Sequence, residues 1–229
     1  MVCVTMFPAP RGRRFVWGGT VMHDATKTIA EFVEALAART PTPGGGSVAA
    51  LAGALATALG EMVVNYSLGK KDLDAYADEL KGALAELTRA RHVLMQLMVE
   101  DQLAYEALSA ARKLPADSAE RKEKLPAAIL ACIRVPETIA ATGIAVLEVC
   151  DRIVTFVNRW LLADLAVAAD LAMATIRCAI YNVRTNMRLL EDPSDRQAAQ
   201  NLIGHLLTRA LMLIQSVAPR IWQRHEEGT

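Results

Sequence analysis

The chain has 229 residues, 53% of them hydrophobic and 22% charged, and its 25 basic side chains balance its 25 acidic ones. One domain of this length can bury a large core, and the balanced charge argues against a nucleic-acid or membrane partner. A mean hydropathy of +0.23 indicates apolar surface left over after one copy folds, so we expect a homo-oligomer.

The first 24 residues lack the sequence features expected of the folded domain. Residues 1–24 contain two prolines and no apolar stretch of signal-peptide length, so we interpret them as a disordered extension or the product of an upstream start codon. Residues 25–229 are then expected to form one helical-bundle domain. Its first helix follows from apolar residues at helical spacing between Ile29 and Ala37, and it stops before Thr40 and Pro41.

A second helix is expected from Ser47, as its N-cap, to about Ser67. This segment is apolar nearly all round, which could indicate a transmembrane span. Glu61 and Asn65 interrupt it, however, and no basic residues flank its start. A buried central helix is therefore the preferred interpretation.

Four more helical segments follow, and none shows the two-residue alternation of a β-strand. They are expected at Asp72 to about Leu114, after the turn at Pro115–Ser118 to about Asp151, from near Trp160 to before Pro193, and from Ser194 to about Gln223. Pro126 and Pro136 could bend the second of these. The predicted fold class is all-α, an up-and-down bundle of long helices.

Cysteine and histidine usage limits the chemistry. The four cysteines form no CxxC pair and no disulfide framework, which favours a reducing cytoplasm. The four histidines are scattered along the chain, and no cluster has the spacing of metal ligands. We therefore expect a cytoplasmic protein that uses no metal.

The most unusual motif is PTPGGGS at residues 41–47. Gly44, Gly45 and Gly46 allow backbone N–H groups to face a ligand, and a helix that begins at Ser47 would favour an anion there. A tight turn between helices is the alternative, and the bare motif favours it. A P-loop is excluded because no GK[ST] follows the glycines.

The run PTPGGGSVAA at residues 41–50 resembles the cyclodeaminase/methenyltetrahydrofolate cyclohydrolase family, which includes the second domain of formiminotransferase-cyclodeaminase. Further matching pieces occur in order at residues 62–63, 65–71, 100–105, 113–115, 135–136, 164–165 and 182–186, and the likeness covers roughly Thr28 to Val217. It implies a cyclodeaminase-like helical fold, a homodimer, and a folate substrate with no further cofactor. It also implies that Gly44, Gly45, Gly46 and Ser47 bind that substrate.

The resemblance further implies chemistry at the bridge between N5 and N10 of tetrahydrofolate. Either water opens the methenyl bridge to give 10-formyltetrahydrofolate, or formimino-tetrahydrofolate closes with loss of ammonia. Both reactions need a group that moves protons and a site that tolerates a cationic substrate. Asp101 matches the family's acidic position for this role, and Tyr105 lies one helical turn farther on. Without the resemblance, Asp101 would read as an ordinary exposed acid beside Glu100.

Other polar residues are candidates for the same site. Asp164 and Asn182 are 18 residues apart, which is five turns of one helix, so they share a face with Asn186 close by. We expect Asp164 to be catalytic and the two asparagines to bind substrate or neighbouring helices. Lys70 and Lys71 match the family's Gly-Lys-Lys and, by resemblance, meet the glutamate tail of the folate; two solvated lysines are the alternative.

One stretch departs from the family. Where the resemblance predicts Gly-Asn-x-Asn-x-x-Ser-Asp, residues 157–164 read VNRWLLAD, so only Asn158, a predicted substrate ligand, and Asp164 match. The bulky indole of Trp160 is expected to change the shape of the site where residues 157–164 border it.

Two functions follow from these patterns. The first is a folate enzyme, with the cyclohydrolase reaction favoured over cyclodeamination because the chain carries no formiminotransferase domain. The second is a non-catalytic folate- or metabolite-binding relative, which the altered stretch would favour.

Overall fold

The computed structural model describes residues 27–226, and the predicted extension at residues 1–24 lies outside this range. Within it the fold is all-helical, which confirms the predicted fold class. The helices are α1 (Ile29–Ala37), α2 (Gly45–Asn65), α3 (Ala77–Lys113), α4 (Ala119–Ile153), α5 (Leu162–Asn186) and α6 (Pro193–Glu226), joined by the short 3-10 turns η2 (Lys71–Tyr76), η3 (Arg159–Leu161) and η4 (Met187–Leu189).

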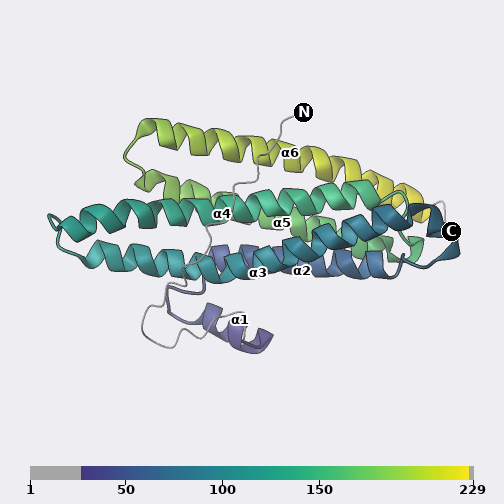
Figure 1. Ribbon diagram of the computed structural model, residues 1–229, viewed down its shortest axis with the longest axis horizontal. Helices are drawn as coiled ribbons and strands as arrows, with labels where there is room; N and C mark the ends of the chain where they lie inside the picture. Colours follow the sequence, from purple (N-terminus) through teal and green to yellow (C-terminus); the bar gives the residue numbers. More distant parts are fainter. Residues whose placement is uncertain (1–26, 227–229) are drawn as a thin grey trace.

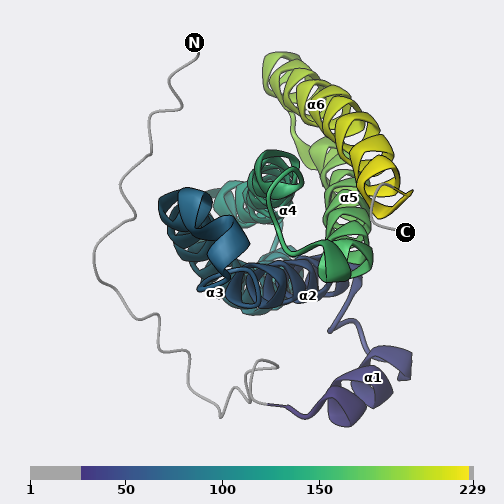
Figure 2. The same ribbon diagram turned by 90° about the vertical axis from the view of Figure 1, so that its right-hand side faces the viewer.

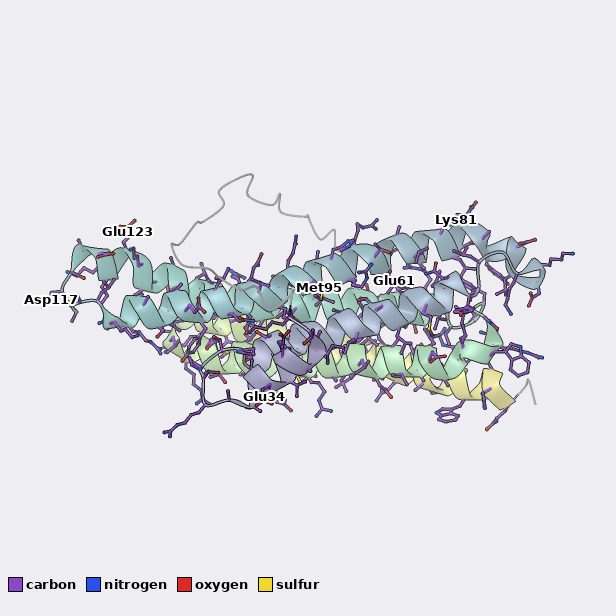
Figure 3. The ribbon with its side chains drawn as sticks, turned by 90° about the horizontal axis from the view of Figure 1, so that it is seen from below. Glu34, Glu61, Lys81, Met95, Asp117 and Glu123 are labelled. Carbon is purple, nitrogen blue, oxygen red and sulfur yellow. The ribbon has the colours of Figure 1, made fainter. Side chains whose placement is uncertain are left out.

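The long helices run antiparallel to their chain neighbours and form an elongated bundle (Figure 1). Helix α2 packs against α3 and α5, α4 packs against the same two helices, and α6 lies along α4 and α5 (Figure 2). Asp117 lies at the tip of the α3–α4 hairpin and Lys81 near the other end of the bundle (Figure 3). Helix α1 lies to one side of the long helices (Figure 2), and its buried residue Phe32 belongs to the hydrophobic core.

The core depends on how closely α2 approaches its neighbours. Small residues at Ala49, Gly53, Ala56 and Gly60 are buried on this helix. A Cβ atom on Gly53 would lie 3.0 Å from side-chain carbons of both Leu94 on α3 and Thr175 on α5. The row of small residues therefore lets α2 occupy the centre of the bundle, as helices with small interface residues can approach closely.

Two helix starts differ from the sequence prediction. Helix α2 begins at Gly45 with Gly44 as its extended N-cap residue, so Ser47 lies inside the first turn and is not the cap. Helix α3 begins at Ala77 and not at Asp72, because the segment before it forms the 3-10 turn η2. That turn buries Leu73 and stacks the Tyr76 ring on Phe156 with centroids 4.6 Å apart.

Helix α2 is central but not fully enclosed. Its most apolar window is 56% buried. Among residues 27–226, three helices, α2, α4 and α6, are long and apolar enough by length and composition to cross a membrane. The uncovered part of α2 carries an apolar row at helical spacing, which we call the α2 outer face: Val48, Leu51, Leu55, Leu59 and Met62. Leu55 at its centre is 51% exposed. The expectation of a buried helix is met on two of its sides only.

Candidate functional site

The first turn of α2 meets the middle of α3 at Asp101. The Ser47 hydroxyl oxygen lies 3.1 Å from Asp101 Oδ2 and 3.1 Å from the Met98 carbonyl oxygen; a hydroxyl has one hydrogen, so it donates to one of them at a time. A Cβ atom on Gly46 would lie 1.9 Å from Asp101 Oδ1. The third glycine of the motif is therefore required because the Asp101 carboxylate occupies the space of a side chain.

Burial sets the acidity of this carboxylate. Loss of water around Asp101 raises its pKa above the ordinary value, and hydrogen bonds from the Ser47 side chain and backbone offset part of the rise. The first turn of α2 adds its positive dipole end beside the carboxylate. A carboxyl group with a raised pKa holds a proton more readily than an ordinary aspartate, which suits a group that accepts and returns a proton.

Helix α5 contributes two asparagines to the same place. The side-chain amide of Asn182 would lie 3.6 Å from a Cβ atom on Gly45, so it covers the glycine motif. Its Nδ2 donates to the Cys178 carbonyl at 2.9 Å, and Asn186 Nδ2 donates to the Cys132 carbonyl at 2.8 Å. With both amide nitrogens bonded to carbonyls, the amide oxygens are the groups that can accept a hydrogen bond from a ligand.

Cys132 is a member of this site that the sequence did not indicate. Burial raises the pKa of its thiol to about 11, and the nearby negative charge of Asp101 contributes. The thiol is therefore a neutral, buried wall and not a nucleophile. Its nearness to Asp101 follows from the packing of α3 against α4, 31 residues along the chain, and no local pattern announces it.

Tyr105 borders this group from α3. It lies one turn beyond Asp101 on the same side of the helix, and its side chain is 44% exposed. Because α2 begins level with Asp101, Tyr105 projects past the end of that helix. A molecule bound over the glycine motif would reach it, and its catalytic role stays a prediction.

The remaining predicted residues lie elsewhere in the protomer. The 18 residues from Asp164 to Asn182 amount to about 27 Å of helix, so their shared face does not bring them together. Asn158, Lys70 and Lys71 are near the Asp164 end. Within a single copy of the chain Asp164 therefore does not lie beside Asp101, and the roles predicted for Asp164, Asn158, Lys70 and Lys71 stay predictions.

Asn158 has a structural explanation of its own. It is 8% exposed, its backbone N–H donates to the Ser67 hydroxyl at 2.9 Å, and its Oδ1 accepts from the Trp160 N–H at 3.2 Å as the cap of η3. It fixes the loop between α4 and α5.

Trp160 and Glu61 each have a partner in the described part of the chain. Trp160 is 72% exposed, with the Arg159 guanidinium 4.7 Å from its ring centroid, and at that end of α5 it does not form a wall beside Asp101. Glu61 is ion-paired with Arg91 of α3, Oε1 to Nε, at 2.7 Å. Its position in an apolar helix is explained by that partner.

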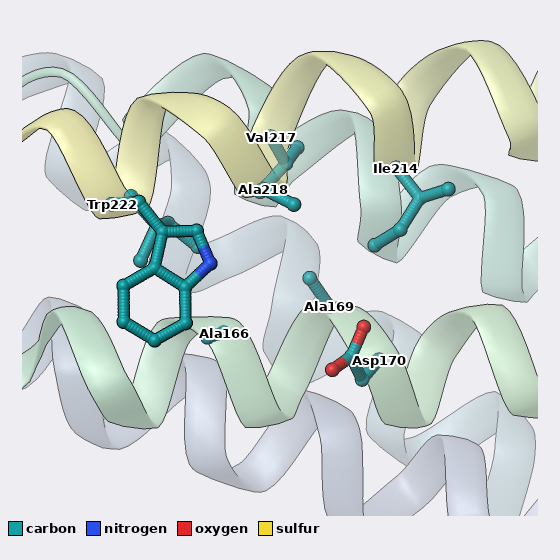
Figure 4. A pocket seen from close by; sticks show the side chains of 8 residues that line it. Ala166, Ala169, Asp170, Ile214, Val217, Ala218 and Trp222 are labelled. Carbon is teal, nitrogen blue, oxygen red and sulfur yellow. The ribbon is translucent and has the colours of Figure 1, made fainter.

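Two grooves separate α5 from α6, and neither includes Asp101. Figure 4 shows the smaller, about 80 Å³ in volume, where Asp170 and the Trp222 indole border alanine and branched apolar side chains. The larger, about 290 Å³, lies near the other end of α5 and includes Arg177, Tyr181 and Arg184. The second groove is the one close to Asn182.

The fold has a solved counterpart. The crystal structure of a formiminotetrahydrofolate cyclodeaminase from Thermotoga maritima superposes with a TM-score of 0.80 at 27% sequence identity, and the match covers 86% of this chain and 97% of that one. The bundle is therefore of the cyclodeaminase class.

The sequence comparisons agree. The family model described as formiminotransferase-cyclodeaminase matches residues 28–203, and the chain belongs to that family. A methenyltetrahydrofolate cyclohydrolase of Methylorubrum extorquens is 32% identical over 188 residues, which are 80% of this chain and 90% of the relative. A formimidoyltransferase-cyclodeaminase of Gallus gallus is 29% identical over 189 residues, 81% of this chain but 35% of the relative. The chain thus spans about a third of that longer protein.

Proposed function

We propose that the protein is a folate one-carbon enzyme that hydrolyses 5,10-methenyltetrahydrofolate to 10-formyltetrahydrofolate. The observation that carries this proposal is the partly buried Asp101 carboxylate, which has a raised pKa and lies against the glycine motif at the start of α2. A carboxylate in that place favours a cationic amidinium bridge and can move protons beside it.

The steps balance with Asp101 as the proton carrier. A water oxygen attacks the bridge carbon and transfers one proton to the Asp101 carboxylate, which gives a neutral tetrahedral carbon. The bond from that carbon to N5 then breaks, Asp101 returns its proton to N5, and the remaining hydroxyl proton leaves to solvent as the formyl C=O forms. One proton is released per turnover, and Asp101 ends as it began.

Ser47 positions this group. Its hydroxyl lies 3.1 Å from Asp101 Oδ2, and a hydrogen bond there holds the carboxylate against the first turn of α2. In this proposal Asn182 and Asn186 accept hydrogen bonds from the folate ring system, whose exocyclic amino group and ring N–H groups are donors.

The cyclodeaminase reaction is the second candidate, because the Thermotoga maritima structure carries that name. There N10 attacks the carbon of the protonated formimino group, Asp101 accepts the N10 proton and returns it to the departing nitrogen, and ammonia leaves as the methenyl cation forms. The preference for hydrolysis is supported by the Methylorubrum extorquens cyclohydrolase, 90% of whose length is covered by the match.

One assay separates these candidates. Purified protein is mixed with 5,10-methenyltetrahydrofolate and the loss of methenyl absorbance is compared with a protein-free blank; a parallel reaction with 5-formiminotetrahydrofolate follows the gain of that absorbance and the release of ammonia. Faster loss than the blank supports hydrolysis, and gain with ammonia release transfers the function to cyclodeamination. Binding of either folate without turnover would contradict an enzyme and favour a binding protein.

We also propose that the protein acts in the cytoplasm as a homodimer that covers the α2 outer face with a second copy. The face spans about 21 Å from Val48 to Met62 without a charged side chain, and a two-fold axis near Leu55 would place the Lys70 end of one copy beside the Asp101 end of the other. Leu55→Glu should give a monomer by light scattering, whereas Leu130→Glu, at a 47% exposed site on α4, should not. A parent that is monomeric at micromolar concentration, or that partitions into vesicles, would contradict this.

A further inference from the structure

The larger groove between α5 and α6 has the composition of an anion site. Its volume is about 290 Å³, and it is lined by Arg177, Tyr181 and Arg184 of α5 and by apolar side chains that include Leu207 and Leu211 of α6. Guanidinium groups beside an apolar floor bind carboxylates in a fork geometry, and a tyrosine ring packs on the methylenes between them.

The stretches of α5 and α6 that line this groove carry no acidic side chain. No Asp or Glu occurs between residues 171 and 190 or between residues 196 and 225, which covers the facing parts of both helices. Two arginines elsewhere on α6 are neutralised by α4, Arg209 by Glu148 at 2.9 Å and Arg220 by Asp151. Within residues 27–226, Arg177 and Arg184 form no such ion pair, so this strip is positive in a chain of zero net charge.

The groove also lies next to the candidate site. Tyr181 precedes Asn182, which covers Gly45, and Arg184 falls between Asn182 and Asn186 in sequence. One residue is 100° around a helix, so the path from the Asn182 side chain to Tyr181 is about 10 Å over the surface of α5. Arg177 and Arg184 are two turns apart, about 10.5 Å, with Tyr181 midway.

We propose that this groove binds the glutamate tail of the folate, with the carboxylates of successive γ-linked glutamates paired to Arg184 and then Arg177. The inference rests on the proposed function for the choice of ligand. It assigns the tail to α5 and α6 of the same copy that holds Asp101, whereas Lys70 and Lys71 are at the far end of α2. Tyr181 and the leucines of α6 pack against the methylenes of the tail.

The test uses the full chain and two stable oxidised folates, pteroylmonoglutamate and pteroyltriglutamate, with affinities measured by titration calorimetry. The parent should bind the triglutamate more tightly, and the preference should shrink as salt is raised. The double variant Arg177→Ala/Arg184→Ala should lose triglutamate affinity by about 10- to 100-fold while monoglutamate affinity falls much less. The control variant Arg89→Ala/Lys122→Ala removes the same amount of charge at exposed positions of α3 and α4 and should keep the preference for the triglutamate. Circular dichroism checks that every variant is folded.

The outcomes separate this inference from the enzymatic proposal. Three results would overturn the groove as the tail site, even if the parent turns over methenyl-folate. They are a double variant that keeps the triglutamate preference, a parent that has no such preference, and loss of the preference in Lys70→Ala/Lys71→Ala alone. An arginine-dependent preference in a parent without turnover would uphold the groove and defeat the enzyme.

Discussion

The Gly46→Ala substitution adds one methyl group at the point where α2 meets Asp101. The new Cβ would lie 1.9 Å from Asp101 Oδ1 and 2.4 Å from Cγ, and no side-chain torsion keeps the carboxylate in place at those distances. Asp101 must rotate away, which breaks its contact with Ser47. Overpacking costs about 1–3 kcal/mol, part of which the better helix propensity of alanine offsets. A catalytic group moved by about 1 Å loses about 10²-fold in rate, equivalent to about 2.7 kcal/mol in the activation barrier.

The measurement is kcat/KM for loss of methenyl absorbance, with the free energy of unfolding in urea as the structural check. Gly82→Ala is the control, because a Cβ atom there meets nothing within 4 Å; it should stabilise the exposed helix by about 0.5–1 kcal/mol and keep full activity. A Gly46→Ala protein with parental kcat/KM would refute the reasoning, since it would show that the position of the Asp101 carboxylate does not matter.

Three further predictions concern the same site. Ser47→Ala removes a hydrogen bond that lowers the pKa of Asp101, so the acid limb of the kcat/KM–pH profile should move to higher pH; an unmoved limb would mean that another group titrates there. Burial raises the pKa of Asp101, so ionisation of this group destabilises the folded protein as pH rises from its ordinary pKa to its raised one. Above that pH window Asp101→Asn should therefore unfold at a higher temperature than the parent, and below the window the two should unfold at similar temperatures. A variant that is less stable than the parent at pH 7 would contradict the raised pKa. Asn182→Ala should raise KM about 10-fold or more with little change in kcat, and an unchanged KM would remove Asn182 from the folate contact.

The sequence predicted the helices well because their signals are local. The Ser118 side chain, which follows the predicted turn, caps α4 by accepting a hydrogen bond from the Arg121 N–H at 3.2 Å. Helix α1 has the predicted bounds. The start of α3 was missed because the stack of Tyr76 on Phe156, 80 residues later, holds the preceding segment in a 3-10 turn. Contacts of that separation leave no pattern in a local window.

Only part of the candidate site could be predicted, because contacts between helices leave no local pattern in the sequence. Periodicity placed Asp164 and Asn182 on one face of α5, but a face extends along the whole helix and says nothing about which neighbour each residue meets. The resemblance supplied Asp101 and the glycine motif, and only the structure shows why they belong together, since Gly46 makes room for the carboxylate. Cys132 and the arginine groove depend on packing between helices, which neither spacing nor motif encodes.

Asp101→Asn provides the most direct test of the central claim. The substitution keeps the shape of the side chain and removes the base, so the rate of methenyl hydrolysis should fall by about 10²- to 10⁴-fold while the affinity for 10-formyltetrahydrofolate stays close to that of the parent. A variant that hydrolyses the methenyl bridge at the parental rate would contradict the account and assign the proton transfer to another group.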